Sequence, residues 1–242
     1  PGSNGGHSDV SGTSAGAGQD HRIPTAAAGK LINNMVKKIS GSRRAQLLAE
    51  SGSRSAEHWE RIVGHVRLTL ERIVLSPVLS RIMLGAIHEH VAQECSLKER
   101  TLILRSLPRS QLSDILGLPT RKGLGDCEWA GAIATLKAFD DVDMPSLKLR
   151  VLLRLKDEIF GEAAAAGVLD MNADEFLPVM TYVIIHAQLQ HPYAATMLLR
   201  EILTDDVVTG EAAYYLTTLE IALGHLLSME LPRDVVSSSI QA

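Results

Sequence analysis

The sequence has few aromatic residues and almost no cysteine. Phe, Trp and Tyr together make up 4% of the 242 residues, whereas all apolar residues together make up 45%. A core of this composition has to consist mainly of Leu, Ile, Val and Ala, and helix is its natural form. The two cysteines, Cys95 and Cys127, are too few for a disulfide framework and are typical of a chain in a reducing compartment.

Basic charge and long apolar runs are also lacking. The net charge is -4 at pH 7 and the pI is about 6.2, which argues against the basic surface of a general nucleic-acid-binding protein. Arg, His or Glu interrupts every apolar stretch before the roughly 18 residues that a membrane-spanning helix needs. We therefore expect a soluble chain with no transmembrane segment and no nucleic-acid partner.

Helical periodicity organises most of the chain, so the predicted fold class is all-α. No segment alternates convincingly at period two, and no repeat of fixed period occurs. Residues 1–24 are rich in Gly and Ser and are predicted to form a flexible tail, which begins with a sequence resembling a cloning scar. We divide the remainder into an N-terminal helical bundle, residues 25–89, packed on a layered helical core, residues 90–235.

Local signals place individual helices within these two parts. A long helical stretch is expected from about residue 55 to 94, with a bend at Ser76-Pro77. Ser96 and Glu99 have the spacing of a capping box, which predicts that the next helix begins there. Further helices are predicted from residue 25 onward and at 110–116, 127–139 and 145–160.

One predicted helix, which begins after Asn172, carries an acid that the core does not require. Asn172 and Glu175 have capping-box spacing, so Asp174 lies in the first turn, where the helix dipole favours a negative charge. Pro178 falls inside this helix and removes one backbone hydrogen bond, which predicts a kink or loosening at Asp174.

The same helix is apolar nearly all round. At about 100° per residue, one arc forms the expected core stripe and the opposite arc carries further apolar groups beside the acid. The helix is therefore either sandwiched between other helices or meets a partner. The first arc contains Phe176, Met180, Val183, Ile184 and Ala187, and the second contains Asp174, Pro178, Thr181, Tyr182 and Ile185.

Another predicted helix follows Gly210 and has an aromatic, hydroxyl-bearing face beside its core stripe. Because an amphipathic ring with two rotatable bonds binds at low entropic cost, Tyr214 is a candidate contact residue. The core stripe contains Tyr215, Leu219, Ala222, Leu223 and Leu226, and the second face contains Tyr214, Thr217, Thr218, Ile221 and His225.

These two segments resemble the vacuolar-protein-sorting-nine domain, a family of guanine-nucleotide exchange factors for Rab GTPases of the Rab-five subfamily. The resemblance rests on Ala173-Asp174-Glu175-Phe176-Leu177-Pro178-Val179-Met180-Thr181-Tyr182-Val183 and on Gly210-Glu211 followed by Tyr214-Tyr215-Leu216-Thr217. The resemblance is strong over residues 170–228 and weaker over 70–230. Within the family, the sequence is most similar to the Rabex-like or the Ras-and-Rab-interactor-like members. Residues 90–235 would then be the catalytic domain of the family.

The resemblance implies roles for eight residues. Asp174 would be the acidic finger that enters the nucleotide site of the GTPase, and Tyr214 with Thr217 would hold the switch regions open. Pro178 would shape the finger, while Phe176, Tyr182, Ile185 and Ile221 would line a groove for switch side chains.

The resemblance also implies the partner and the setting. The partner would be a Rab-five-type GTPase, bound most tightly when it is free of nucleotide. Exchange involves no covalent chemistry, so the chain would be an exchange factor rather than an enzyme in that sense, and no cofactor is expected. It would be cytoplasmic and recruited to early endosomes, meeting the membrane only indirectly.

Other interpretations of the sequence are weaker. A helical adaptor that binds a small GTPase or a partner helix without exchange activity remains the alternative. His88, His90 and Cys95 do not predict a metal site, because residues two apart on a helix point apart. Neither a phosphate-binding loop nor a nucleophile elbow occurs.

Overall fold

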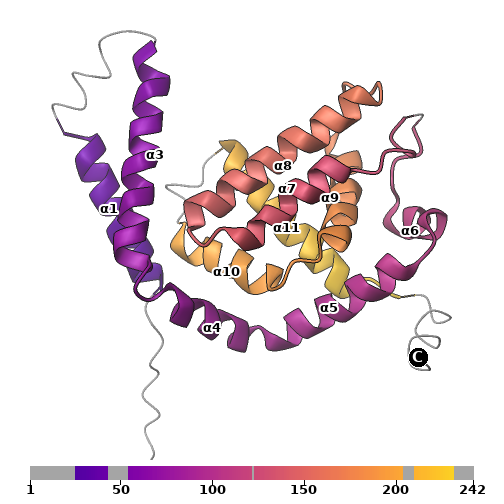
Figure 1. Cartoon of the computed structure of the whole chain (residues 1–242), viewed down its shortest axis with the longest axis horizontal. Coiled ribbons are helices and arrows are strands. Elements are labelled where there is room, and N and C mark those ends of the chain that lie inside the picture. Colours follow the sequence, from indigo (N-terminus) through magenta and orange to yellow (C-terminus); the bar gives the residue numbers. More distant parts are fainter. Residues whose placement is uncertain (1–24, 43–53, 122, 204–209, 232–242) are drawn as a thin grey trace, which may run out of the picture.

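The computed structural model describes residues 25–42, 54–121, 123–203 and 210–231, and every regular element in them is a helix (Figure 1). The helices are α1 (Thr25–Ser40), α3 (Arg54–Leu75), α4 (Leu79–Glu89), α5 (Val91–Ser106), α6 (Arg109–Leu116), α7 (Ala130–Asp141), α8 (Pro145–Ala165), α9 (Ala173–Ala187), α10 (Pro192–Ile202) and α11 (Gly210–Ser228). The predicted all-α fold class is confirmed. The predicted tail, residues 1–24, lies outside the described residues. No helix in the described ranges is long and apolar enough to cross a membrane.

The helical stretch predicted from residue 55 to 94 is divided among three helices. α3 ends at Leu75 and α4 begins at Leu79, so the predicted bend at Ser76-Pro77 is a break between helices. A second break, at His90, separates α4 from α5. Figure 1 shows α4 and α5 following one edge of the molecule in an arc, with α1 and α3 side by side at its end.

The helix start predicted at Ser96 is wrong. α5 already begins at Val91, and Ser96 lies inside it, where its hydroxyl accepts a hydrogen bond from Nε of Arg100 at 3.2 Å. The earlier start is stabilised from outside the helix, because Glu94 in its first turn binds the backbone N–H of Ala194 in α10 at 2.7 Å. A tertiary contact therefore overrides the local signal.

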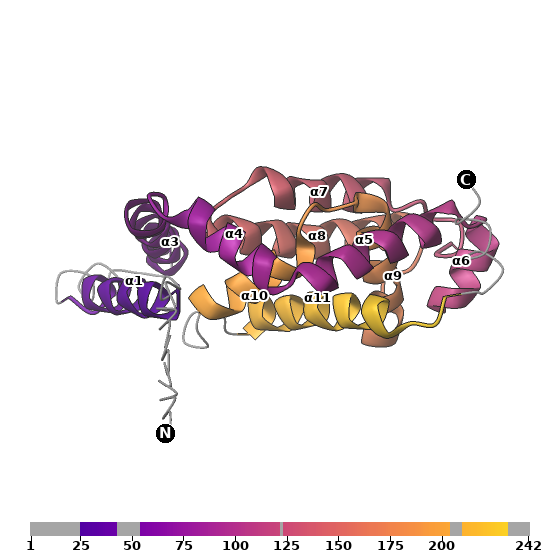
Figure 2. The same cartoon turned by 90° about the horizontal axis from the view of Figure 1, so that it is seen from below.

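The main core is formed by buried side chains from the part of the chain that runs from α5 to α11. Figure 2 shows α7, α8 and α11 stacked in layers, and α9 packs against both α7 and α11. α6, α7 and α8 confirm the helices predicted at 110–116, 127–139 and 145–160, with shifted ends. α10 was not predicted from the sequence.

A smaller core cluster joins the N-terminal helices to α10. It contains Ile32 and Val36 of α1, Leu70 and Leu75 of α3, Ile82 of α4, and Leu198 and Ile202 of α10. α1 approaches α10 so closely that a side chain at Gly29 would meet the backbone oxygen of Ile202 at 2.4 Å. The division at residues 89 and 90 stays a prediction.

Candidate functional site

The first turn of α9 is closed by the capping box predicted from the sequence. The side-chain oxygen of Asn172 accepts a hydrogen bond from the backbone N–H of Glu175 at 3.0 Å. The Glu175 carboxylate in turn accepts a bond from the backbone N–H of Asn172 at 3.1 Å. This reciprocal pair satisfies donors that a helix start leaves free, so the turn that carries Asp174 has a fixed beginning.

Asp174 is exposed in this turn. In the described part of the chain, no hydrogen bond or ion pair involves its carboxylate, although its acidic neighbours Asp170 and Glu175 both bind Arg121. A charge-assisted bond to a cation outside the chain therefore requires no bond within it to break.

α9 continues through Pro178, which is half-buried. Because proline has no N–H, the backbone carbonyl of Asp174 lacks the hydrogen bond that residue 178 would normally donate. The hydroxyl of Thr181 donates to the carbonyl of Leu177 at 2.9 Å. The predicted kink stays a prediction.

Aromatic rings connect the first turn of α9 to the first turns of α11. The ring of Phe176 stacks on Phe160 of α8 with centroids 5.6 Å apart and contacts Tyr215 of α11 at 5.3 Å. Tyr215 meets the edge of Tyr214 at 5.0 Å. These contacts hold the helix turns of Asp174 and Tyr214 against one another through buried rings.

α11 has the two faces predicted from its sequence, with one exception. Tyr215 and the rest of the core stripe are buried, whereas Tyr214 is 48% exposed and Ile221 is 51% exposed. Thr217 and His225 are also exposed. The placement of Thr218 on the outer face is wrong: it is buried and donates its hydroxyl hydrogen to the carbonyl of Tyr214 at 2.9 Å.

Three residues predicted to line a partner groove lie in the core of this structure. Phe176, Tyr182 and Ile185 are 3%, 5% and 0% exposed. The reason is that α9 is sandwiched, which was one of the two outcomes its all-round apolar pattern allowed. Of the eight candidates, Asp174, Tyr214, Thr217 and Ile221 are exposed, and Pro178 is half-buried.

Arg200 of α10 supports the exposed face of α11. Its guanidinium donates to the hydroxyl of Thr217 and forms an ion pair with Glu220, with Nη2 and Oε2 3.0 Å apart. Sequence reasoning missed Arg200, Glu220 and Arg121. No local pattern identifies them, because their partners lie 17 to 54 residues away along the chain.

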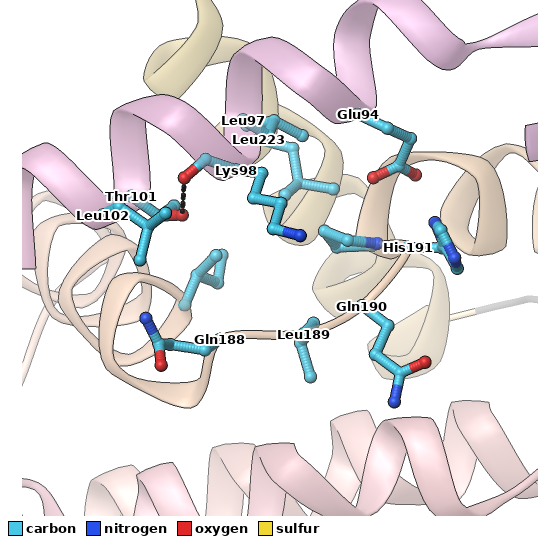
Figure 3. Close-up of a pocket in the computed structure, with 12 residues that line it drawn as sticks. Glu94, Leu97, Lys98, Thr101, Leu102, Gln188, Leu189, Gln190, His191 and Leu223 are labelled. Carbon is cyan, nitrogen blue, oxygen red and sulfur yellow. Dashed lines mark hydrogen bonds between the residues drawn. The ribbon is translucent and has the colours of Figure 1, made fainter.

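A separate pocket of about 430 Å³ lies among α5, the loop between α9 and α10, and α11 (Figure 3). Glu94, Lys98 and Gln190 are among its polar lining groups. None of the eight candidate residues lines it. The Glu94 carboxylate accepts a hydrogen bond from the backbone N–H of Ala194 near the N-terminus of α10.

Residues 129–231 match the family model described as the Vacuolar sorting protein 9 (VPS9) domain. This range contains α7 to α11 and all eight candidate residues, and the match confirms the resemblance found in the sequence.

Curated relatives match most of this chain. The chain is 25% identical over 234 residues to Ras and Rab interactor 1 of Homo sapiens, covering 89% of this chain and 29% of that protein. It is 26% identical over 199 residues to Ras and Rab interactor 3 of Mus musculus, covering 81% and 20%. It is 21% identical over 211 residues to the Alsin homolog of Drosophila melanogaster, covering 84% and 14%. The chain therefore spans less than a third of the length of each of these relatives.

Proposed function

We propose that this protein is a guanine-nucleotide exchange factor for Rab GTPases of the Rab-five subfamily, with Asp174 as its acidic finger. The observation that carries the proposal is an exposed Asp174, with no hydrogen bond or ion pair to the described residues, in a capped first helical turn within the VPS9 match. The names Ras and Rab interactor among its relatives support a Rab partner.

The mechanism is competition for one cation. In the GTPase, a lysine and Mg²⁺ neutralise the phosphates of bound GDP. The Asp174 carboxylate would enter this site and form a charge-assisted hydrogen bond with the lysine, while repelling the phosphate oxygens and disturbing the metal. GDP then leaves without any covalent step, and the chain itself needs no cofactor.

The exposed face of α11 would contact the switch regions. Tyr214 and Ile221 offer apolar surface, and Thr217 offers a hydroxyl that Arg200 already orients. The ring of Tyr214 packs in a T-shaped arrangement with Tyr215, and this contact would reduce the side-chain freedom that is lost when the GTPase binds. Phe176, Tyr182 and Ile185 would act from the core by holding α9 in place.

We further propose that the protein acts in the cytoplasm and is recruited to early endosomes, where it would meet the membrane only through its partners. This placement follows from the proposed Rab-five specificity and fails with it.

The test is release of fluorescent GDP from a panel of Rab GTPases. The wild-type chain should accelerate release from Rab-five-type members, and Asp174→Ala should abolish most of that acceleration. The same change should cost only about 0.3–1 kcal/mol of stability, because it removes a first-turn acid and no buried contact. Arg81→Ala, which changes an exposed charge on α4, is the matched control.

Two outcomes would contradict the proposal. An Asp174→Ala variant with wild-type exchange would remove the finger assignment. A wild-type chain that binds the GTPases but leaves GDP release unchanged would instead be the helical adaptor considered above.

A further inference from the structure

Arg121 lies beside the proposed finger, in the loop between α6 and α7. Its Nη2 donates to Oδ1 of Asp170 at 2.8 Å, and its Nη1 lies 3.3 and 3.4 Å from the two carboxylate oxygens of Glu175. Asp170 precedes the capping residue of α9, and Glu175 closes the capping box. One guanidinium thus spans the turn that leads into the finger.

Residues 123–127, which follow Arg121 in its loop, are held by close contacts. Leu124 is 2% exposed in the main core. At Gly123, where φ is 101°, a side-chain carbon would meet the backbone oxygen of Ala166 at 2.2 Å, so only glycine permits this approach to the end of α8. Arg109 binds the carbonyls of Gly125 and Cys127 farther along. Arg121 therefore reaches Asp170 and Glu175 from an anchored backbone.

The acceptor is fixed as well. The Glu175 side chain is 15% exposed and is already held by its bond to the backbone of Asn172. An exposed ion pair usually contributes little because two long side chains must be ordered. Here the ordering of Glu175 has already been achieved by the capping box, and the forked guanidinium matches two acceptors at once.

Arg121 pairs with some of the acidic residues around the proposed finger but not with Asp174. Three acids, Asp170, Asp174 and Glu175, lie within six residues, and Arg121 pairs with the first and the third. Hydrogen bonds from Arg121 lower the pKa of Asp170 below its usual value, which favours the ionised carboxylate that the ion pair requires. The acid between them is left for an external cation.

We propose that Arg121 is a positioning residue for exchange: by clamping Asp170 and Glu175 it fixes the turn that presents the Asp174 carboxylate to the GTPase. This inference rests on the proposed function. Arg121 acts through the turn and does not itself bind the GTPase. Since misplacement of a reacting group by about 1 Å can cost up to about a hundredfold in rate, loss of one clamp should give a smaller but measurable loss.

The test is the rate of GDP release as a function of the concentration of this protein. Arg121→Ala should lower the maximal rate about 3- to 10-fold while the half-saturating concentration changes less than about twofold. Arg121→Lys should recover part of the rate, because an ammonium can bind one carboxylate but cannot form the fork. Arg81→Ala should match the wild type in both parameters.

A second measurement does not depend on exchange activity. In Arg121→Ala, the backbone amides of residues 170–178 should exchange with solvent deuterium faster than in the wild type, and those of α4 should not change. Arg81→Ala should leave the amides of residues 170–178 unchanged.

The outcomes separate this inference from the proposed function. A wild-type chain inactive on every Rab overturns the proposed function, and the positioning role falls with it. An active wild type with an equally active Arg121→Ala variant overturns the positioning role alone. So does a loss confined to the half-saturating concentration, which would make Arg121 a direct contact, or unchanged amide exchange at residues 170–178.

Discussion

Tyr214 and Tyr215 are adjacent in the sequence but have opposite environments. Tyr214 is 48% exposed, whereas Tyr215 is 9% exposed and packs on Phe176 of α9. We expect Tyr214→Ala to weaken engagement of the GTPase with little loss of stability. Tyr215→Ala should cost about 3–5 kcal/mol, because it leaves a cavity between α9 and α11. Urea denaturation and titration against nucleotide-free Rab measure the two effects.

The pair is its own matched control, since both changes remove the same side chain from neighbouring positions. If Tyr214→Ala were the less stable variant, the assignment of the two faces of α11 would be reversed. If Tyr215→Ala kept wild-type stability, the aromatic contacts that join α9 to α11 would contribute nothing measurable.

At the scale of single residues, helical periodicity predicted most of the exposed groups, but it did not predict which apolar groups off the core stripe are buried. The exposure of Asp174, Tyr214 and Thr217 agrees with a helix that turns about 100° per residue and buries one stripe of side chains. Tyr182 and Ile185 lie off that stripe yet are buried, because a second layer covers the other side of α9. A single sequence does not reveal how many layers cover a helix.

At the scale of secondary-structure elements, two helix starts show when a local capping signal is enough to predict where a helix begins. The capping box at Asn172 is confirmed, and α9 begins directly after it at Ala173. The box predicted at Ser96 is overridden by Glu94, which pairs with α10 from an earlier turn of α5. α10 itself escaped prediction because Pro192 begins it without a side-chain cap, and its buried residues pack into both core clusters.

The contribution of Glu94 to the stability of the fold should depend on pH. Burial raises the pKa of Glu94, although its bond from Ala194 and the nearby His191 favour the charged form. The folded state therefore binds a proton more readily than the unfolded state. As the pH falls from neutral through this raised pKa toward the ordinary value, Glu94 should contribute progressively more to the free energy of unfolding.

Glu94→Gln isolates this contribution. The amide oxygen can still accept the bond from Ala194 and carries no charge at any pH, so the variant should lack this part of the pH dependence. The stability of Glu94→Gln relative to the wild type should be greater at pH 7 than at pH 5, measured by urea unfolding. A difference that is constant with pH would contradict a raised pKa at Glu94.

At the scale of the whole molecule, one buried carboxylate links the N-terminal helices to α8. Glu71 of α3 is 0% exposed and accepts bonds from Nε of Arg67 at 3.2 Å and from the backbone N–H of Ser146 at 3.0 Å. Ser146 lies in the first turn of α8, where an acid is favoured by the helix dipole. Arg67 also donates to Asn33 of α1 at 2.7 Å.

Removing this tie should destabilise the molecule strongly. Glu71→Ala leaves the buried Arg67 guanidinium without its carboxylate partner, so we expect a loss of about 3–5 kcal/mol in urea unfolding. Replacing both Arg67 and Glu71 by Met removes both charges and should recover much of that loss. A double variant as unstable as Glu71→Ala would mean that the bonds to α8, rather than the unpaired charge, dominate.

On the proposed function, the nucleotide state of the GTPase should decide how tightly this chain binds it. If Asp174 competes with phosphate and Mg²⁺, the protein should bind nucleotide-free Rab at least about a hundredfold more tightly than the GDP- or GTP-analogue-loaded forms. Linkage makes the effect reciprocal. If this protein lowers the affinity of the GTPase for GDP by some factor, GDP lowers the affinity of the GTPase for this protein by the same factor.

Titration of EDTA-stripped, GDP-loaded and GTP-analogue-loaded Rab-five-type GTPase measures this preference, and addition of GDP with Mg²⁺ to a preformed complex tests its reversal. The complex should dissociate, because on the proposed mechanism the finger and the phosphates would require the same lysine. Asp174→Ala should flatten the preference, since the α11 face would contact the switch regions without entering the nucleotide site, whereas Arg81→Ala should retain it. Tightest binding to a loaded form, with a complex that survives GDP, would make this protein an adaptor that recognises one nucleotide state through Tyr214 and Thr217.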